Sequence, residues 1–500
     1  MSAEPKTTKK DYTSIPQTNI PHHNGGLDGD TVNEDDFDFD IDNEDDLVDH
    51  TLESMDYQVE VPGEEPTETG TSSMRMAFLN MANSILGAGI IGQPFAFRNS
   101  GLVGGIIVMV LLTILIDWTL RLIVINSHLS QTKSYQDTVN HCYGKYGKIL
   151  LLFAISSFAY GGCMAFCVII GDTIPHVLKA FIPTSITGPD SAIGWLFKRN
   201  VIIVLFTTCI SYPLSLNRDI SKLAKASGFA LVGMLIIVVL TIVRAPFVDS
   251  SLRAPLTKLE WTVNYNIFQG ISVISFALVC HHNTILIYQS MKNASISKFA
   301  KLTHISCIVS MICCLTMGIN GVVNFGDATK GNVLNNFRSD DNWINVARFC
   351  FGLNMLTTFP LEVFVVRDVL KDVILGNAEG STADLELNKM QHFTITTILV
   401  FSSMSVSLLT CNLGIILELI GATSASLMAY IIPPLCYLKL SWDQIDYKSS
   451  SKEDKREFII WKALPSIACV LFGFSVMFIS SFMSITQAVQ GGTAGHCVDD

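Results

Sequence analysis

Polar residues and glycines interrupt an apolar run that begins near residue 75. The stretch "NMANSILGAGIIGQPFAF" (residues 80–97) carries Asn83, Ser84, Gly87 and Gly89 among apolar neighbours. Unpaired backbone N–H and C=O groups are costly in hydrocarbon, so irregular backbone persists there only beside protein or a water-filled cavity. Glycine accepts strained dihedral angles and lets other groups approach the backbone. The pattern therefore predicts a broken helix that borders a cavity.

The ends of a broken helix can bind charged groups. One half-helix presents its positive N-terminal end, which suits a carboxylate, and the other presents carbonyl groups, which suit an ammonium group or a cation. The candidate binding residues in this stretch are Asn83, Ser84, Gly87, Ala88 and Gly89. In the alternative interpretation, Gly87 and Gly89 only allow helices to pack closely, as small residues often do in membranes.

A second interruption occurs in the stretch "NIFQGISVISFALVCHHNTILIYQSM" (residues 266–291). Gly270 weakens its first half, and Cys280 and His281 open a polar cluster at depth. Polar clusters inside membrane spans are costly and usually functional. We expect Phe276 and Cys280 to contact a ligand. His281 is a candidate for ion coupling because histidine titrates near neutral pH, although it would also suit a structural hydrogen bond between helices.

The composition is that of a multi-pass membrane protein. Of the 500 residues, 49% are hydrophobic and only 15% are charged, against roughly 25% charged in soluble domains. The apolar residues form runs of about 20, long enough to cross a hydrocarbon layer of about 30 Å. These runs predict an all-α integral membrane protein with eleven transmembrane helices, at residues 75–97, 102–125, 149–176, 200–216, 227–243, 263–288, 301–325, 343–366, 391–411, 414–438 and 458–483.

The two interrupted spans are the first and the sixth. Five helices are an odd number, so a second unit of five enters the membrane from the opposite side. The pattern predicts two inverted repeats, residues 75–243 and 263–438, followed by one extra helix at residues 458–483. Interrupted helices at matching positions of two such halves indicate the midplane binding site of a secondary transporter.

The net charge of −11 is unevenly distributed. Residues 1–74 carry −17 and the remainder carries +6, so we expect the first segment to be a disordered acidic tail. Such a tail improves solubility, directs sorting or docks on a cytoplasmic partner. If it is cytoplasmic, the inside loops hold 18 Lys and Arg residues and the outside loops hold 10. This bias predicts a cytoplasmic N-terminus and places residues 484–500 in a lumen or outside the cell.

Glu418 lies inside the tenth predicted span, just before "GATSAS". Loss of water around a carboxyl group favours its protonated form, which suits proton uptake near neutral pH. Glu418 is therefore a candidate for ion coupling, and the alternative is a buried acid satisfied by hydrogen bonds. The sequence has no GxxxxGK[ST], GxSxG, HExxH or CxxC pattern, so it predicts no enzyme, no cofactor and no structural metal site. It predicts no nucleic-acid partner either.

The interrupted spans resemble those of a known family. "NMANSILGAGIIGQPFAFRNSG" is similar to the first-helix signature of the amino acid/auxin permease family, above all its sodium-coupled neutral and fungal vacuolar branches. "SFALVCHHNTILIYQSM" is similar to that family's sixth helix, and "ELIGATSASLMAYIIPPLCYLKL" to its tenth. The resemblance covers about residues 72–483 and leaves out the acidic tail.

This resemblance implies a leucine-transporter-like fold of five plus five helices and one more, which exchanges L-amino acids by alternating access. In the sodium-coupled branch, an Asn of the first helix and a Thr of the eighth bind Na⁺, and Asn83 and Thr358 match these positions. In the fungal vacuolar branch protons usually drive transport, so the match leaves the ion open. His282 departs from the family pattern, because related chains often have Pro there.

We thus expect a secondary active transporter of neutral amino acids in a vacuolar or other endomembrane, coupled to a proton or sodium gradient. The expected partners are the amino acid, H⁺ or Na⁺, and the lipid bilayer. A rival hypothesis is an amino-acid sensor that signals through the acidic tail, and a channel is a third. Uptake that persists without the tail would separate the transporter from the sensor.

Overall fold

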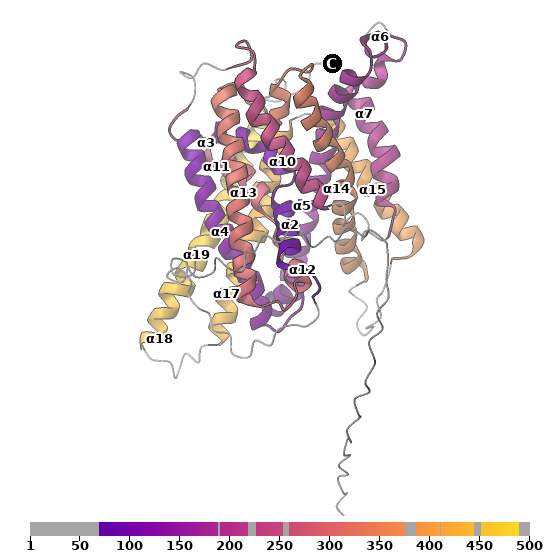
Figure 1. Ribbon diagram of the computed structural model, residues 1–500. Coiled ribbons are helices and arrows are strands. Elements are labelled where there is room, and N and C mark those ends of the chain that lie inside the picture. Colours follow the sequence, from indigo (N-terminus) through magenta and orange to yellow (C-terminus); the bar gives the residue numbers. More distant parts are fainter. Residues whose placement is uncertain are drawn as a thin grey trace, which may run out of the picture. The chain divides into compact units, whose positions relative to one another are not determined.

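Long apolar helices account for most of the chain (Figure 1). The computed structural model describes residues 70–188, 191–218, 227–253, 260–375, 387–410, 412–444 and 452–489. In these ranges the regular structure is helical, and the one β-bridge joins Ser72 to Met291. The prediction of an all-α membrane protein is confirmed.

Nine helices in the described ranges are long and apolar enough to cross a membrane. A tenth candidate is the pair Met74–Ile85 and Ala88–Ser100, whose axes differ by 42°. The fourth predicted span, 200–216, corresponds to the apolar helix Arg199–Ser215, which is shorter than 18 residues. The count of eleven spans therefore stays a prediction.

The first and sixth spans are the two interrupted ones. The first consists of α2 (Met74–Ile85), the 3₁₀ turn η2 (Ala88–Gly92) and α3 (Gln93–Ser100). The sixth consists of α11 (Ile267–Leu278), the 3₁₀ turn η7 (His281–Asn283) and α12 (Thr284–Ser290). Both breaks that the sequence predicts are present.

The other spans are single helices or helices with a π-helical section. The single ones are α4 (Leu102–Leu129), α5 (Tyr135–Phe181), α10 (Ser227–Arg244), α13 (Ile296–Phe325), α14 (Asn342–Leu375) and α15 (Lys389–Leu409). Those with a π-helical section are α7 (Arg199–Phe206), η4 (Thr207–Ser211) and α8 (Tyr212–Ser215); α16 (Leu413–Ile420), η10 (Gly421–Ala425), η11 (Leu427–Ile431) and α17 (Ile432–Asp443); and α18 (Lys452–Glu457), η12 (Phe458–Ala463) and α19 (Leu464–Val489). Short connecting elements are α6 (Thr184–Thr187), η3 (Gly194–Phe197), η5 (Ala245–Phe247), η8 (Gly326–Ala328) and η9 (Val333–Asn336).

Some observed ends differ from the predicted ones. The helix α5 begins at Tyr135, well before residue 149, and consists of two helical parts that meet at a bend at Gly144, where φ is 64°. The helix α19 continues to Val489, beyond the predicted end at residue 483. The acidic tail up to residue 69 and residues 490–500 lie outside the described ranges.

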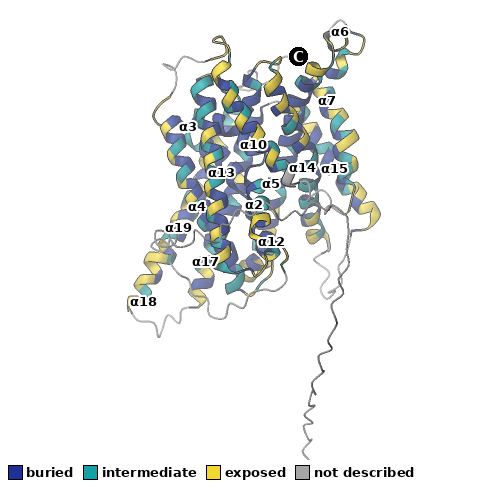
Figure 2. Ribbon diagram, viewed as in Figure 1, coloured by how far each residue is buried: buried dark blue, intermediate teal, exposed yellow. Residues whose placement is uncertain are grey.

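The sixth span lies in the interior of the bundle. In the most apolar part of Ile267–Ser290, 83% of the residues are buried, against 28% in Lys452–Val489. Figure 2 shows the same contrast, with exposed residues along the outward faces of α13 and α15. A helix that is apolar all round and buried on all sides belongs to a core, so the sixth span is surrounded by protein.

Two close backbone approaches hold the broken helices together. A Cβ at Gly89 would lie 2.4 Å from Cβ of Ala277, so only glycine lets the first break approach α11. A Cβ at Gly270 would lie 1.9 Å from Oγ of Ser100, so α11 packs directly on α3. As a result α3 contacts α11, and α2 contacts α12.

A short backbone pairing joins the start of the first span to the end of the sixth. The N–H of Ser72 donates to the carbonyl of Ser290 at 2.8 Å, and the N–H of Lys292 donates to the carbonyl of Ser72 at 2.9 Å. These bonds hold the beginning of α2 beside the end of α12.

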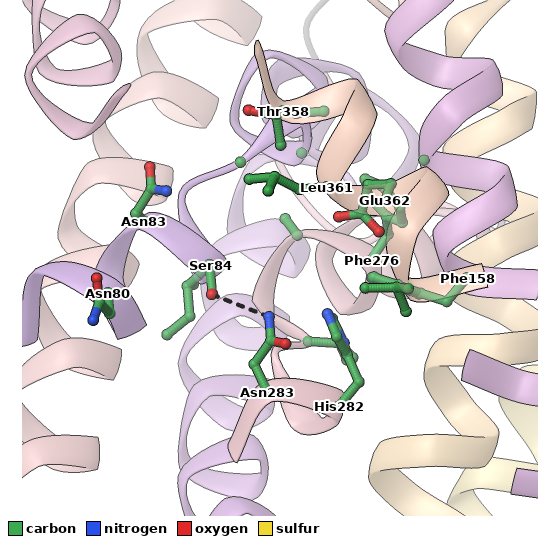
Figure 3. A pocket seen from close by; sticks show the side chains of 18 of the residues that line it. Asn80, Asn83, Ser84, Phe158, Phe276, His282, Asn283, Thr358, Leu361 and Glu362 are labelled. Atoms are coloured by element: carbon green, nitrogen blue, oxygen red, sulfur yellow. Dashed lines mark hydrogen bonds between the residues drawn. The ribbon is translucent and has the colours of Figure 1, made fainter. Parts of the chain in front are cut away.

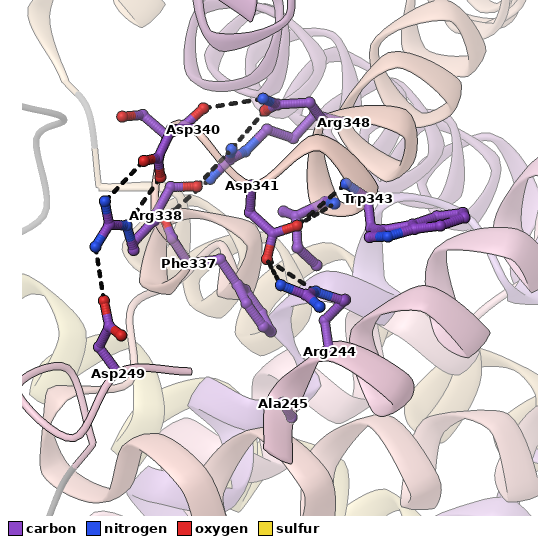
Figure 4. A network of polar contacts seen from close by, with 12 residues as sticks. Arg244, Ala245, Asp249, Phe337, Arg338, Asp340, Asp341, Trp343 and Arg348 are labelled. Carbon is purple, nitrogen blue, oxygen red and sulfur yellow. Dashed lines mark hydrogen bonds and ion pairs between the residues drawn. The ribbon is translucent and has the colours of Figure 1, made fainter. Parts of the chain in front are cut away.

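A polar network orders the loop between α13 and α14 (Figure 4). Arg244 at the end of α10 pairs with Asp341 at 2.9 Å. Arg338 pairs with Asp340 at 2.7 Å, and its hydrogen bonds lower the pKa of the Asp340 carboxyl. Arg348 is fully buried beneath this loop. Since α13 starts shortly after α12 ends, this network lies at the opposite end of the bundle from the Ser72 pairing.

Candidate functional site

A cavity of about 440 Å³ lies at the two helix breaks (Figure 3). It reaches from the breaks toward Asn80 on α2 and toward Ser290, the last residue of α12. It is lined by Asn80, Asn83, Ser84, Ile85, Gly87, Ala88, Gly89, Phe158, Gly162, Phe166, Phe276, Ala277, Val279, His282, Asn283, Leu286, Ile287, Ser290, Thr358, Leu361, Glu362, Phe364 and Val365. The walls come from both interrupted spans and from α5 and α14.

Four helix ends meet at this cavity because each interrupted helix stops and restarts beside it. The first helix makes its last turn where the N–H of Leu86 donates to the carbonyl of Ala82 at 2.8 Å. The sixth ends where the N–H of Val279 donates to the carbonyl of Ser275 at 3.1 Å. The last turn of α2 and the start of η2 both border the cavity, so one negative and one positive helix end face it, and Val279 brings the end of α11 to the same wall.

Most residues of the predicted binding set line this cavity. Asn83, Ser84, Gly87, Ala88, Gly89 and Phe276 are all in its wall. Thr358, the second predicted sodium ligand, also lies in the wall, and its hydroxyl donates to Oδ1 of Asn354 at 3.0 Å. The structure thus brings the two predicted sodium ligands to one cavity, from α2 and α14.

Cys280 and His281 lie away from the cavity. Both side chains are fully buried, and neither is among the lining residues. Nε2 of His281 is 2.9 Å from Oγ1 of Thr119 on α4, which is the interhelical hydrogen bond of the alternative interpretation. The backbone of Cys280 is part of the break, since this residue directly precedes η7. The ligand and coupling roles of these two residues stay predictions.

Glu418 also lies away from the cavity, in a buried polar cluster. Its carboxylate accepts hydrogen bonds from Nδ2 of Asn99 at 2.9 Å, Nε2 of Gln269 at 3.1 Å and Oγ of Ser484 at 2.7 Å. These donors belong to α3, α11 and α19, so the cluster joins four elements of the bundle with α16. The predicted coupling role remains a prediction, and the geometry is that of a fully hydrogen-bonded acid.

Several cavity residues are not in the predicted site. Glu362 on α14 is the one acid among the described lining residues, and His282 and Asn283 line the cavity whereas Cys280 and His281 do not. Nδ2 of Asn283 donates to Oγ of Ser84 at 3.4 Å. The polar cluster "CHHN" indicates this region, but which of its members face the cavity depends on the turn after the break.

The lining combines polar groups with aromatic and aliphatic groups. The ring of Phe158 lies 5.3 Å from that of Phe276 and 5.5 Å from that of His282. Sites for small molecules usually join an apolar wall to a few placed polar groups. This cavity can hold a small zwitterion at the helix ends and an apolar side chain against the rings.

Comparison with known proteins is consistent with this geometry. Residues 70–486 match the family described as "Transmembrane amino acid transporter protein". The chain belongs to this family. It is therefore a member of a transporter family rather than an enzyme, and the resemblance seen in its helix motifs is confirmed.

Similar proteins include vacuolar and sodium-coupled transporters. Vacuolar amino acid transporter 2 of Saccharomyces cerevisiae is 50% identical over 432 residues, which are 85% of this chain and 86% of that protein. Putative sodium-coupled neutral amino acid transporter 11 of Mus musculus is 33% identical over 421 residues, 84% of this chain and 86% of that protein. Sodium-coupled neutral amino acid transporter 7 of Danio rerio is 25% identical over 420 residues, 83% of this chain and 86% of that protein.

Proposed function

We propose that this protein is a secondary active transporter that carries neutral L-amino acids by alternating access. The observation that carries the proposal is the cavity between two interrupted helices, where half-helix ends of both signs meet. A zwitterionic amino acid matches such ends, with its carboxylate at the N-terminal ends and its ammonium group at the carbonyl ends. The neutral class is supported by the apolar wall and by the names of the sodium-coupled relatives.

The proposed substrate contacts follow from the lining. Asn83, Ser84 and the backbone from Gly87 to Gly89 bind the common part of the amino acid, and Phe276 contacts its side chain. Cys280 contributes through its backbone, because its side chain is buried away from the cavity. If Na⁺ is a coupling ion, it binds between Asn83 and Thr358, which offer oxygen ligands from two helices.

The proposed architecture is an inverted repeat of five plus five helices with one more at the C-terminal end. The shorter helix Arg199–Ser215 would be its fourth span. We further propose a vacuolar or other endomembrane location and a cytoplasmic N-terminus. The vacuolar relative supports the first, and the distribution of Lys and Arg supports the second.

Uptake into proteoliposomes tests the function. The purified full chain is reconstituted, pH or sodium gradients are imposed, and radiolabelled alanine, leucine, glutamine, lysine and glutamate are offered. Gradient-driven accumulation of the neutral amino acids is the expected result, and it should persist when residues 1–69 are deleted. Amino-acid binding without flux under any gradient would instead favour the sensor.

A matched pair of variants connects the flux to the cavity. Asn83→Ala removes a lining amide, whereas Asn324→Ala removes an amide on α13, away from the lining residues. We expect a large loss of uptake in the first and little change in the second. Equal effects of the two variants would contradict the proposed site.

A further inference from the structure

Among the described residues that line the cavity there is a single carboxyl group and no lysine or arginine. The carboxyl belongs to Glu362 on α14, and Figure 3 shows it beside the space enclosed by the breaks. Its Oε2 is buried and has no hydrogen-bond partner among the described residues. Gly162 of α5 lies beside this side chain, since a Cβ at Gly162 would be in ordinary contact with Cγ of Glu362, at 3.7 Å.

Glu362 as a whole is half-buried, and the buried acids in the described part of the bundle are all paired. Asp117 lies 3.3 Å from Arg121 and 3.0 Å from His304. Asp172 lies 3.3 Å from Arg199. Glu418 accepts the three hydrogen bonds described above. Glu362 differs from all of them because its buried Oε2 has no partner among the described residues and is available to a group that enters the cavity.

The neighbouring titratable groups do not neutralise Glu362. On α5 the nearest is the thiol of Cys163, which is buried. On α14 itself, Arg367 donates to the carbonyl of Ser215 at 2.9 Å and to Oγ1 of Thr396 at 3.1 Å, so its guanidinium is engaged elsewhere.

Among the described residues of the other elements packed on α14, no cation forms an ion pair with Glu362. Arg244 of α10 pairs with Asp341, at the far end of that helix. In η4 and α8 the titratable groups are the exposed Cys209 and Tyr212, whose hydroxyl bonds to Thr397. His392 of α15 lies beside Arg367.

His282 of η7 faces the cavity, but no ion pair joins it to Glu362 in the described chain.

A lone carboxylate is expensive in a cavity that closes around a neutral ligand. A charge removed from water must be paired or neutralised, and here the described lining offers no lysine or arginine and a zwitterion brings no net charge. A cationic ligand or Na⁺ would pair with the carboxylate. With a neutral amino acid in the cavity, the charge of the carboxylate can be removed only by protonation. The transporter therefore closes at lower cost when the carboxyl carries a proton.

We propose that Glu362 is the proton-binding residue of this transporter, and that its proton crosses the membrane together with the neutral amino acid. This proposal rests on the proposed function. The carboxylate takes a proton from water on the more acidic side, forming an O–H bond at the carboxyl group. The cavity, now occluded and without net charge, then opens toward the other side of the membrane. The proton returns to water on the other side, so one proton moves for each amino acid and no other bond changes.

The test compares proton-driven accumulation with exchange in proteoliposomes, using radiolabelled leucine and lysine. With one proton per substrate, a gradient of one pH unit supports about tenfold accumulation by the wild-type protein. E362Q keeps the shape of the side chain but cannot release a proton. We expect its accumulation ratio to fall to about one, and its leucine exchange to become independent of pH.

Two further variants separate the proposed role from damage to the fold. E362D restores a carboxyl group and should recover part of the proton-driven accumulation. E457Q changes an exposed glutamate on α18 and should behave as the wild type. Size-exclusion profiles and leucine-dependent thermal shifts establish that each variant is folded and binds substrate.

The outcomes distinguish this proposal from the proposed function. If the wild type accumulates leucine under a pH gradient and E362Q does so equally well, the role of Glu362 is wrong and the transporter stands. The role of Glu362 is also wrong if only a sodium gradient drives uptake, or if E362Q loses lysine uptake alone. It is wrong as well if H282Q and not E362Q loses the pH dependence of transport, or if folded E362Q and E362D no longer bind leucine. If no gradient drives the wild type, the proposed function itself fails.

Discussion

Nδ2 of Asn283 donates a hydrogen bond to Oγ of Ser84 across 3.4 Å, and this bond joins the two interrupted helices at the cavity wall (Figure 3). Ser84 is in the last turn of α2, and Asn283 is the last residue of η7, directly before α12. The distance is long for a hydrogen bond, so the bond is weak. A ligand that enters the cavity, or a movement that separates α2 from α12, can break it at low cost.

Ser84→Ala and Asn283→Ala should each weaken substrate affinity, because each removes a polar group that faces the ligand. We expect each KM to rise about fivefold, which corresponds to about 1 kcal/mol. The double variant should show a coupling energy of at most about 0.5 kcal/mol, since the bond between the two residues is weak. A double-mutant cycle on the KM of uptake measures this coupling. Coupling well above that value would show that the pair acts as a fixed unit.

Glu418→Gln should reduce stability more than it changes the pH dependence of transport. The carboxylate accepts from three donors, and an amide offers one acceptor while it adds two N–H groups. Unpaired donors in a buried cluster cost about 1–3 kcal/mol. Thermal unfolding of the purified protein should therefore occur at a clearly lower temperature.

The control for this substitution is Glu457→Gln, at an exposed position of α18. Its unfolding temperature should match that of the wild type. If Glu418→Gln were stable and had lost proton-driven accumulation, the sequence-based hypothesis that Glu418 couples protons would be supported instead.

The sequence predicts the spans well because a membrane imposes their length and apolarity. The second predicted span, 102–125, starts where α4 starts, and both breaks fall at the glycine-rich or polar stretches that predicted them. The bend at Gly144 and the π-helical sections such as η10 were not predicted, because they depend on how neighbouring helices pack. Composition and periodicity carry no signal for such packing.

The sequence predicts the residues of the candidate site only where the interrupted backbone itself forms the wall of the cavity. The positions from Asn83 to Gly89 are linked to the break by sequence, so the structure brings them to the cavity as a group. Glu362 lies five residues before Arg367 in the sequence. Residues five apart on a helix face different sides, and Arg367 indeed bonds elsewhere. Only the rotation of α14 about its axis reveals that Glu362 faces the cavity.

Gly87→Ala should impair transport without loss of stability, whereas Gly89→Ala should lower stability. A Cβ at Gly87 would meet nothing within 4 Å, so the added methyl group would enter the cavity and hinder the substrate. A Cβ at Gly89 would lie 2.5 Å from Cα of Ala277, so α11 would have to move. Overpacking of this kind costs about 1–3 kcal/mol.

Thermal unfolding and leucine uptake, measured on both glycine variants, check this pair. Gly87→Ala should unfold like the wild type and transport poorly, whereas Gly89→Ala should unfold at a lower temperature. Equal loss of stability in both variants would mean that the break is held together by the dihedral angles of its glycines rather than by the contact with α11.

Arg348→Met should destabilise the end of the bundle opposite the Ser72 pairing far more than Arg338→Met (Figure 4). Arg348 is fully buried, and its Nη2 donates to the carbonyls of Leu334 at 2.7 Å and Phe337 at 3.1 Å. Methionine fills a similar volume but leaves these buried carbonyls without a donor. We expect a loss of about 3 kcal/mol in the free energy of unfolding.

Arg338 is the matched control, because 58% of its side chain is exposed and its ion pairs with Asp249 and Asp340 lie at the surface. Exposed ion pairs contribute little to stability, since water and salt screen them. Arg338→Met should therefore unfold close to the wild-type temperature, and the remaining difference should shrink further in high salt. If the two variants unfolded alike, the buried guanidinium would contribute no more to the loop than a surface pair does, and the loop would be held by its apolar contacts, such as that between Phe325 and Phe337 at 5.2 Å between ring centroids.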